Sequence, residues 1–256
     1  MLLDGKVAVV TGGNQGIGLA VASLMARRGA RVLIAASNPE RGQEAAAQID
    51  QTGERVLYVR TDVSSSADVE AMVAAAVTTF GGIDVLVNNA AIDTKKPLLD
   101  TSEADWDQVL ATNLKGTFLC GRAVVPHMIA RGGGHIVNVS SVLAVWSSPG
   151  YAAYCASKAG IVALTRSMAV EWSRYGIHVN CVLPGSVDTD MMWRYKSPAE
   201  VAASRCREEA NTPVGRVGSP DEIAEAILWL CTPASSFAAG SLFVLDGGVI
   251  AGPPPR

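Results

Sequence analysis

The fold is decided by the segment Lys6-Val-Ala-Val-Val-Thr-Gly-Gly-Asn-Gln-Gly-Ile-Gly-Leu-Ala20. An apolar run typical of a strand leads into a glycine-rich turn, and helical apolar spacing follows it. Glycines in such a turn let the backbone approach a pyrophosphate, which the first N–H groups of the helix hold. The spacing Gly12-x-x-x-Gly16-x-Gly18 differs from G-x-G-x-x-G, but the strand–turn–helix context favours dinucleotide binding. The alternative is a turn that serves helix–strand packing alone.

Beyond this unit, short apolar runs alternate with helical patterns along the chain. Strands are predicted at 6–10, 31–35, 55–59, 85–87, 136–139, 178–183 and 242–245. Helices are predicted from about Pro39, from the capping cluster Ser64–Ser66 to Gly81-Gly82, at 113–130 and at 153–175. Continuous apolar strands are typical of a parallel sheet that is covered on both faces. We therefore predict an α/β fold over 1–251, a single-domain Rossmann-type doubly wound parallel sheet of about seven strands with helices on both faces. This domain is expected to contain a substrate-loop insertion at about 190–219, and a Pro-rich tail follows the domain at 252–256.

The composition excludes several classes of protein. The 256 residues are 49% hydrophobic and 18% charged, with a net charge of -3, which is typical of a globular chain without a nucleic-acid footprint. The five widely spaced cysteines indicate reduced thiols in a cytoplasmic protein, and no apolar run is long enough to span a membrane. The three histidines are isolated, so no metal site is expected, and no G-x-S-x-G hydrolase motif occurs.

Tyr154 and Lys158 stand four residues apart in a helical pattern, which places them on one face. A phenol passes protons at neutral pH only if its pKa falls from ~10 toward 7, and a nearby ammonium and an oxidised nicotinamide can lower it. Ser141 follows the strand that ends near Val139, where ligand-facing groups gather, and its hydroxyl is suited to hold a reacting oxygen. Two alternatives stay open: the pair is merely an exposed polar pair, or Ser140 acts in place of Ser141 and the two serines cap a loop.

Taken together, the motifs resemble those of the short-chain dehydrogenase/reductase family over essentially the whole chain. They are Thr11-Gly-x-x-x-Gly-x-Gly18, Asn88-Asn-Ala90, Asn113, Ser141, Tyr154-x-x-x-Lys158 and Pro184-Gly185. The resemblance implies an NAD(P)-dependent enzyme that interconverts a secondary alcohol and a ketone. It makes Tyr154 the general acid/base, Lys158 the ribose ligand that lowers the tyrosine pKa, and Ser141, rather than Ser140, the group that orients the substrate oxygen. Asn113 would hold a water that links Lys158 to solvent.

The resemblance also implies the cofactor contacts. They are Gly12, Asn14, Gln15, Gly16, Ile17, Gly18, Ser37, Asn38, Arg41, Asp62, Val63, Asn89, Ala90, Tyr154, Lys158, Pro184, Gly185, Val187 and Thr189. Asp62-Val63 would lie beside adenine, and Thr189 would lie at the carboxamide. The alternative is that Asp62 only caps a helix and Thr189 is only a turn residue.

The end of the second strand bears on the choice between NADP and NAD. Ala36 stands where a carboxylate would bind the ribose diol of NAD, and the donors Ser37, Asn38 and Arg41 follow, which favours NADP with NAD as the alternative. Gln15 counts against NADP, because NADP-preferring relatives often carry a basic residue there. The alternative for Arg41 is that it is an ordinary solvated helix residue without a role in cofactor binding.

On the substrate side, the resemblance indicates loop residues that border the pocket. They are Asp93, Ser141, Leu143, Trp146, Tyr151, Met191, Met192, Trp193 and Tyr195. Their apolar and aromatic character favours a hydrophobic alcohol or ketone over a phosphorylated sugar; the alternative is that they pack a lid or a subunit contact. Ala91 departs from the family, which usually has Gly after Asn-Asn-Ala, and this puts the substrate space in question.

Two other functions fit the same motifs. A 3-oxoacyl carrier-protein reductase shares all of them, and Arg131 and Arg174 are candidate docking cations or ordinary surface residues. A non-catalytic nucleotide-sensing protein is the second, but it would have no use for the complete set Asn113, Ser141, Tyr154 and Lys158. Family members commonly form homo-oligomers, usually tetramers, through the two long helices after residue 113. Phe118 and Trp172 are candidates for that packing or for the core.

Overall fold

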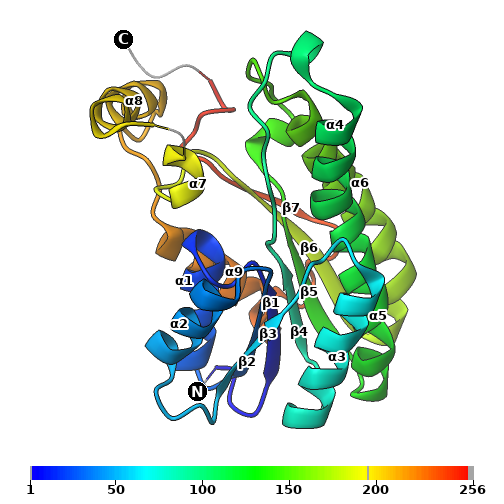
Figure 1. The fold of residues 1–256 in the computed structure, drawn as a ribbon. Helices are drawn as coiled ribbons and strands as arrows, with labels where there is room; N and C mark the ends of the chain where they lie inside the picture. The colour runs from blue at the N-terminus through cyan, green and yellow to red at the C-terminus, as the bar shows by residue number, and fades with distance from the viewer. Residues whose placement is uncertain (1, 195, 253–256) are drawn as a thin grey trace.

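The computed structural model describes residues 2–194 and 196–252, and in that part of the chain a single seven-stranded sheet runs through the molecule (Figure 1). Its strands are β1 (Val7–Thr11), β2 (Arg31–Ala36), β3 (Val56–Arg60), β4 (Val85–Asn88), β5 (Gly134–Val139), β6 (Ile177–Pro184) and β7 (Leu242–Leu245). The order is β3-β2-β1-β4-β5-β6-β7, with every pair parallel. The predicted Rossmann-type doubly wound sheet is confirmed.

Helices cover both faces of this sheet. They are α1 (Gly16–Arg27), α2 (Pro39–Ile49), α3 (Ser66–Phe80), α4 (Glu103–Leu110), α5 (Gly116–Ala130), α6 (Ala152–Trp172), α7 (Asp190–Trp193), α8 (Pro198–Asn211) and α9 (Pro220–Leu230). In Figure 1, α1, α2 and α9 lie on one side of the sheet, and α3, α5 and α6 on the other. Short 3₁₀ turns lie at Leu98–Asp100, Val142–Ala144, Ser173–Tyr175 and Pro233–Ser235, and a π turn at Ala111–Lys115.

Alternate residues of a strand pack into the two hydrophobic cores on opposite faces of the sheet. In β1, Ala8 and Val10 belong to the core under α1 and α9, whereas Val7 and Val9 belong to the core under α3 and α5. All four are at most 1% exposed, because successive side chains of a strand point to opposite faces and both faces are covered. This explains why the central strands are continuous apolar runs in the sequence.

Capping residues set the ends of the helices. The side chain of Ser65 accepts the Asp68 N–H at the start of α3, and Gly81 ends that helix in the left-handed conformation with φ 85°, as the sequence predicts. The segment 190–219 contains α7 and α8, of which α8 begins with a capping box between Ser197 and Glu200. Tyr195 and residues 253–256 of the expected tail lie outside the described residues.

At the amino-terminal edge of the sheet, the buried carboxylate of Asp84 joins three segments. Its Oδ2 accepts the Val7 N–H at 2.9 Å, and Arg131 donates from Nε and Nη2 to its two oxygens at 3.1 and 3.0 Å. Lys6 Nζ lies 3.5 Å away. The site described below lies at the opposite edge. Within the described ranges no helix is both long and apolar enough to cross a membrane.

Candidate active site

The glycine turn lies at the carboxyl ends of β1 and β4, where the strand order reverses and α/β sheets bind ligands. Thr11 Oγ1 accepts the N–H groups of Asn89 and Ala90, both at 3.0 Å. The Asn89 amide donates to the carbonyls of Thr11 and Gly12, both at 3.1 Å. The loop after β4 therefore fixes the shape of the turn.

At positions 12 and 18 of this segment only glycine fits. A Cβ on Gly12 would lie 2.9 Å from Asn89 Nδ2, and one on Gly18 would lie 2.2 Å from the Gly12 carbonyl oxygen. The N-cap residue of the next helix, α1, is Gln15, whose side chain makes no capping hydrogen bond. The first turn of α1 has no acidic residue. Its first N–H groups and helix dipole therefore suit an anion, so these residues fit the pyrophosphate of the dinucleotide that the resemblance implies.

Tyr154 and Lys158 lie one turn apart on α6 and face the same space. Lys158 Nζ lies over the Tyr154 ring, 5.4 Å from its centroid, and donates to the Val139 carbonyl at the end of β5, at 2.8 Å. The Ser141 hydroxyl is close enough to lower the pKa of the Tyr154 phenol, and it accepts the Leu143 N–H at 3.1 Å. Three chemically active groups thus meet where α6 faces the end of β5.

A chain of buried polar contacts holds α6 against the sheet. Ser140 Oγ donates to the Lys158 carbonyl at 2.8 Å, so this hydroxyl is used in anchoring the helix while that of Ser141 faces Tyr154. Farther along, the Asn88 amide donates to Asn138 at 2.9 Å, and the Asn138 amide donates to Thr165 on α6, also at 2.9 Å. This arrangement separates the roles of the two serines that residue reasoning alone had left open.

Asn113 sits in the π turn between α4 and α5 and is fully buried. Its side-chain oxygen accepts the Ile92 N–H, and its amide donates to the Ile92 carbonyl, both at 2.9 Å, and to Ser157 Oγ at 3.0 Å. Ser157 in turn donates to the Tyr154 carbonyl at 2.7 Å. The Asn113 side chain therefore ties the loop after β4 to the first turns of α6.

Burial dominates the electrostatics of the site. It raises the pKa of Tyr154, the charge of Asp93 raises it further, and Ser141 lowers it. The ammonium of Lys158 bonds to the Val139 carbonyl and lies over the face of the Tyr154 ring. Burial also lowers the pKa of Lys158 to about 8.

The lowered pKa of Lys158 predicts a pH dependence of stability. The unfolded chain binds a proton at this position up to its ordinary pKa of 10.5, whereas the folded chain releases it near 8. Stability therefore rises with pH where the unfolded state binds more protons, here between about pH 8 and 10.5. Measured against Lys158→Met by denaturant unfolding, the wild type should gain unfolding free energy over this window. A pH-independent difference between the two proteins would contradict the prediction.

A cavity of about 520 Å³ extends from the glycine turn past Tyr154 to α8. Residues predicted from the sequence that line it are Gly12, Gln15, Gly16, Ile17, Asn89, Ala90, Asp93, Ser141, Leu143, Trp146, Tyr151, Tyr154, Lys158, Pro184, Gly185, Val187, Thr189, Met191 and Met192. Thr189 packs on the turn, since a Cβ on Gly16 would lie 3.1 Å from its methyl group.

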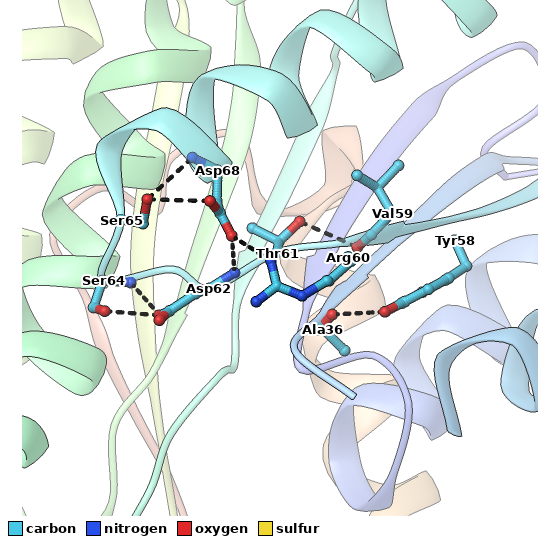
Figure 2. A network of polar contacts seen from close by, with 9 residues as sticks. All are labelled: Ala36, Tyr58, Val59, Arg60, Thr61, Asp62, Ser64, Ser65 and Asp68. Carbon is cyan, nitrogen blue, oxygen red and sulfur yellow. Dashed lines mark hydrogen bonds and ion pairs between the residues drawn. The ribbon is translucent and has the colours of Figure 1, made fainter. Parts of the chain in front are cut away.

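The other predicted residues lie outside this lining: Asn14, Gly18, Ser37, Asn38, Arg41, Asp62, Val63, Asn113 and Trp193. Figure 2 shows the surroundings of Asp62, whose carboxylate accepts the N–H and hydroxyl of Ser64 at 2.9 and 2.7 Å, next to the Ser65 cap of α3. Asp62 thus forms a local turn with Ser64, and the cap of α3 is Ser65 instead. Trp193 Nε1 donates to Asp188 at 2.6 Å.

Sequence reasoning missed several charged residues of the lining, above all Lys95, Lys196, Arg207, Asp190 and Glu208. Most of them belong to the segment 190–219, which was expected to be a loop. The capping-box pattern from Ser197 to Glu200 was the available signal for α8. This pattern predicts where α8 begins. It does not predict which face of α8 lines the cavity, because that depends on how the helix packs.

The candidate docking cations lie far from this cavity. Arg131 precedes β5 and Arg174 precedes β6, so both stand at the amino-terminal edge of a wholly parallel sheet. Arg131 is paired with Asp84, and Arg174 Nη2 donates to the Tyr175 hydroxyl at 2.6 Å.

A Rossmann-type sheet with a glycine turn and a Tyr–Lys–Ser cluster at its carboxyl edge defines the class of dinucleotide-dependent oxidoreductases. A family model described as enoyl-(acyl carrier protein) reductase matches residues 12–250. The chain belongs to the short-chain dehydrogenase/reductase family. It is accordingly an NAD(P)-dependent oxidoreductase that acts on CH–OH and C=O groups.

Curated relatives span nearly the whole chain. An uncharacterized oxidoreductase of Thermotoga maritima is 42% identical over 97% of each chain. A cis-4-hydroxycyclohexanecarboxylate dehydrogenase of Sinomonas cyclohexanicum is 43% identical over 96% of this chain and 97% of its own. A 3-oxoacyl-[acyl-carrier-protein] reductase of Chlamydia muridarum is 39% identical over 97% and 98%. These names are those of enzymes, which removes the support for a non-catalytic sensor.

Proposed function

We propose that this chain interconverts a free secondary alcohol and its ketone, with Tyr154 carrying the proton. One observation carries the proposal: the Tyr154 phenol, the Lys158 ammonium and the Ser141 hydroxyl line a single cavity that also contains the glycine turn. Among the relatives, the cis-4-hydroxycyclohexanecarboxylate dehydrogenase is named for a free secondary alcohol.

A bound nicotinamide would accept or supply the hydride and, when oxidised, place a positive charge near the phenol. In ketone reduction, Ser141 donates a hydrogen bond to the carbonyl oxygen, and Tyr154 gives its proton to the same oxygen. Oxidation runs in reverse, with Tyr154 as the base. Lys158, which is 2% exposed, keeps its ammonium within the dry part of the site, and Asn113 positions α6 through Ser157.

The experiment that tests this proposal is a panel of free ketones and secondary alcohols, each assayed with NADP and with NAD through the nicotinamide absorbance. We expect turnover of free ketones. If the enzyme turned over only acyl thioesters and no free ketone, the proposal would be wrong.

We further propose that NADP is preferred, because β2 ends at Ala36 without a carboxylate and Arg41 lies nearby. Arg41 Nη1 donates to Gln15 at 2.7 Å and lies 3.8 Å from the carboxylate of Asp190, so its guanidinium reaches the edge of the glycine turn. A phosphate on the adenine ribose would attract this cation, whereas the hydroxyl of NAD would not.

Replacing Arg41 with Ala should therefore raise the KM for NADP by about 10-fold and leave the KM for NAD within about 2-fold, as expected for one charge-assisted hydrogen bond. Arg27→Ala is the matched control, since Arg27 is an exposed cation in the last turn of α1. Equal losses with both cofactors would show that Arg41 acts only on the shape of the cavity.

A 3-oxoacyl carrier-protein reductase is the second candidate, and it is favoured by the relatives that carry this name. Its substrate arrives on a protein, so docking cations should surround the cavity. Lys95, Lys196 and Arg207 line it, whereas Arg131 and Arg174 stand at the other edge of the sheet. Comparing kcat/KM for a 3-oxoacyl thioester and for free ketones decides between the two candidates.

We also propose a cytoplasmic homo-oligomer, with tetramers expected. All five cysteines are free thiols, which suits a reducing compartment. On α5, Phe118 is 42% exposed, whereas Trp172 on α6 packs partly into the core, so Phe118 is the better candidate for a subunit contact. Sedimentation equilibrium of the wild type and of Phe118→Ser tests the assembly.

A further inference from the structure

Three side chains join the short helix α7 to its neighbours. The Trp193 indole N–H donates to Asp188 at 2.6 Å, and Arg205 Nη2 donates to both oxygens of the same carboxylate at 2.8 Å. The Arg205 guanidinium also lies over the Trp193 ring, 5.0 Å from its centroid. These residues come from the loop after β6, from α7 and from α8, and the two helices lie side by side (Figure 1). We refer to Asp188, Trp193 and Arg205 as the clamp.

Asp188 is the fixed part of the clamp. Its backbone N–H donates to the Gly218 carbonyl at 2.9 Å, and the preceding residue, Val187, forms a β-bridge with Gly218. This bridge joins the chain after β6 to the chain before α9. The hydrogen bond from Trp193, and then that from Arg205, lower the pKa of the Asp188 carboxyl, so it is ionised at neutral pH. Asp188 therefore offers a charged acceptor at a fixed position.

The helix α7 needs such support. It has four residues, and helix nucleation is too costly for so short a segment to be stable alone. Its N-cap residue, Thr189, makes no side-chain capping hydrogen bond. Hydrogen bonds to a charged group are stronger than those between neutral groups, and those of the clamp converge on one carboxylate. The clamp therefore supplies the stability that α7 lacks.

The residues that α7 positions belong to the cavity, whereas the clamp lies outside its lining. Met191 and Met192 line the cavity. Thr189 packs on the glycine turn, where a Cβ on Gly16 would lie 3.1 Å from its methyl group. Trp193 was expected from the sequence to border the pocket, but its contacts are with the clamp. Its role is thus to hold in place the residues that do border the pocket.

We propose that the clamp positions α7 against the cavity, so that Asp188, Trp193 and Arg205 are positioning residues that set the affinity for the ketone without touching it. The inference rests on the proposed function, because it assumes that the ketone lies in this cavity. Tyr154 lies on α6 and Ser141 follows β5, so neither is held by the clamp. The rate of the chemical step should therefore not depend on it.

Local positioning and global stability should separate here. When the clamp is broken, α7 is in place for only part of the time, and the observed affinity falls by that fraction. Losing hydrogen bonds to a charged group lowers this fraction by about 10-fold. The side chains of Arg205 and Asp188 are 36% and 42% exposed, and an ion pair of this kind contributes little to the free energy of unfolding.

The kinetic test measures KM and kcat for cyclohexanone and for the best free ketone of the panel, at saturating cofactor. The variants are Asp188→Ala, Arg205→Ala, the double variant, and Trp193→Phe, which keeps an aromatic ring and loses the N–H. Arg28→Ala is the matched control, since Arg28 pairs with Glu225 at 3.4 Å between α1 and α9, and both side chains are similarly exposed. Denaturant unfolding and a cofactor titration verify that each variant is folded and binds the dinucleotide.

A second measurement does not depend on turnover. Trypsin cuts after Lys196 and Arg207, which lie in the segment that the clamp holds. Cleavage of a folded chain requires local opening, so its rate reports how often this segment leaves its position. Asp188→Ala keeps both cleavage sites, and its digestion is compared with that of the wild type and of Arg28→Ala.

We expect the KM for the ketone to rise about 10-fold in Asp188→Ala and in Arg205→Ala, with kcat within about 2-fold of the wild type. Because the two residues act through one contact, the double variant should show about the same 10-fold rise and not the product of two rises. Trp193→Phe should raise KM less, about 3-fold, since it loses one of the hydrogen bonds. Trypsin should cut Asp188→Ala about 10-fold faster than the wild type. Arg28→Ala should change none of these values.

An unchanged KM in the single variants, or independent effects in the double variant, overturns the inference and leaves the proposed function standing. A kcat that falls as far as kcat/KM also overturns it, because these residues would then act in the chemical step. If no free ketone is turned over, the proposed function is wrong, and an unchanged rate of trypsin cleavage then overturns the positioning role of the clamp as well.

Discussion

Replacing Tyr154 with Phe should lower kcat by about 10²- to 10⁴-fold, the usual contribution of a positioned acid/base group. The phenyl ring keeps its edge-to-face packing against Tyr151, so the cavity should keep its shape. Only the hydroxyl is lost, and with it the proton that the reacting oxygen needs. Rates of ketone reduction, measured at saturating substrate and cofactor, give the effect.

The variant must still bind the dinucleotide if Tyr154 acts chemically. A fluorescence titration should give a cofactor Kd within about 2-fold of the wild type, since one neutral hydrogen bond contributes little. Tyr175→Phe is the matched control, because this tyrosine lies in the 3₁₀ turn before β6, at the far edge of the sheet. A Tyr154→Phe enzyme with full turnover would remove the proposed mechanism.

Replacing Asp84 with Ala should give the largest loss of stability, about 3 kcal/mol of unfolding free energy. This is the low end of the range for a broken buried ion pair, since the Arg131 side chain is 34% exposed and regains some hydration. The change also leaves the buried Val7 N–H without its acceptor. In a chain of this size the loss corresponds to roughly 6–12 °C in Tm.

Denaturant unfolding at fixed protein concentration measures the effect. Lys6→Ala is the control, because the Lys6 side chain is 54% exposed and its Nζ lies 3.5 Å from the same carboxylate, so the change should cost less than about 1 kcal/mol. Because Asp84 lies at the edge opposite the cavity, kcat should stay unchanged in both variants. An unchanged unfolding midpoint for Asp84→Ala would show that the ion pair contributes nothing net.

The fold could be predicted because the physics that forms it is local or strictly periodic. The strand runs, the capping serines and the Gly81 end of α3 are all confirmed, with strand boundaries that differ by at most two residues. The spacing of Tyr154 and Lys158 places them on one helix face whatever surrounds the helix. Parallel pairing then brings the turn after β1 and the residues after β5 to the same edge.

The parts of the site that could not be predicted depend on groups far apart in the chain. The sequence places Arg131 and Arg174 on a surface, but strand direction decides that this surface is the amino-terminal edge. It offers Lys158 as a cation, but packing directs the ammonium to the Val139 carbonyl and lowers its pKa through burial. The side chains of α8 that face the cavity are likewise set by how the helix docks.

Apolar period, glycine spacing and capping residues therefore determined by themselves that this chain forms a doubly wound sheet with a nucleotide turn and a Tyr–Lys pair. Each of these patterns depends on a few neighbouring residues, so it can be interpreted without knowing how the rest of the chain folds. Only the tertiary structure decided that Ser140 anchors α6 through the Lys158 carbonyl while Ser141 faces the Tyr154 phenol. How deeply a group is buried and which hydrogen bonds it makes depend on residues that are distant in the sequence and become neighbours only when the chain folds.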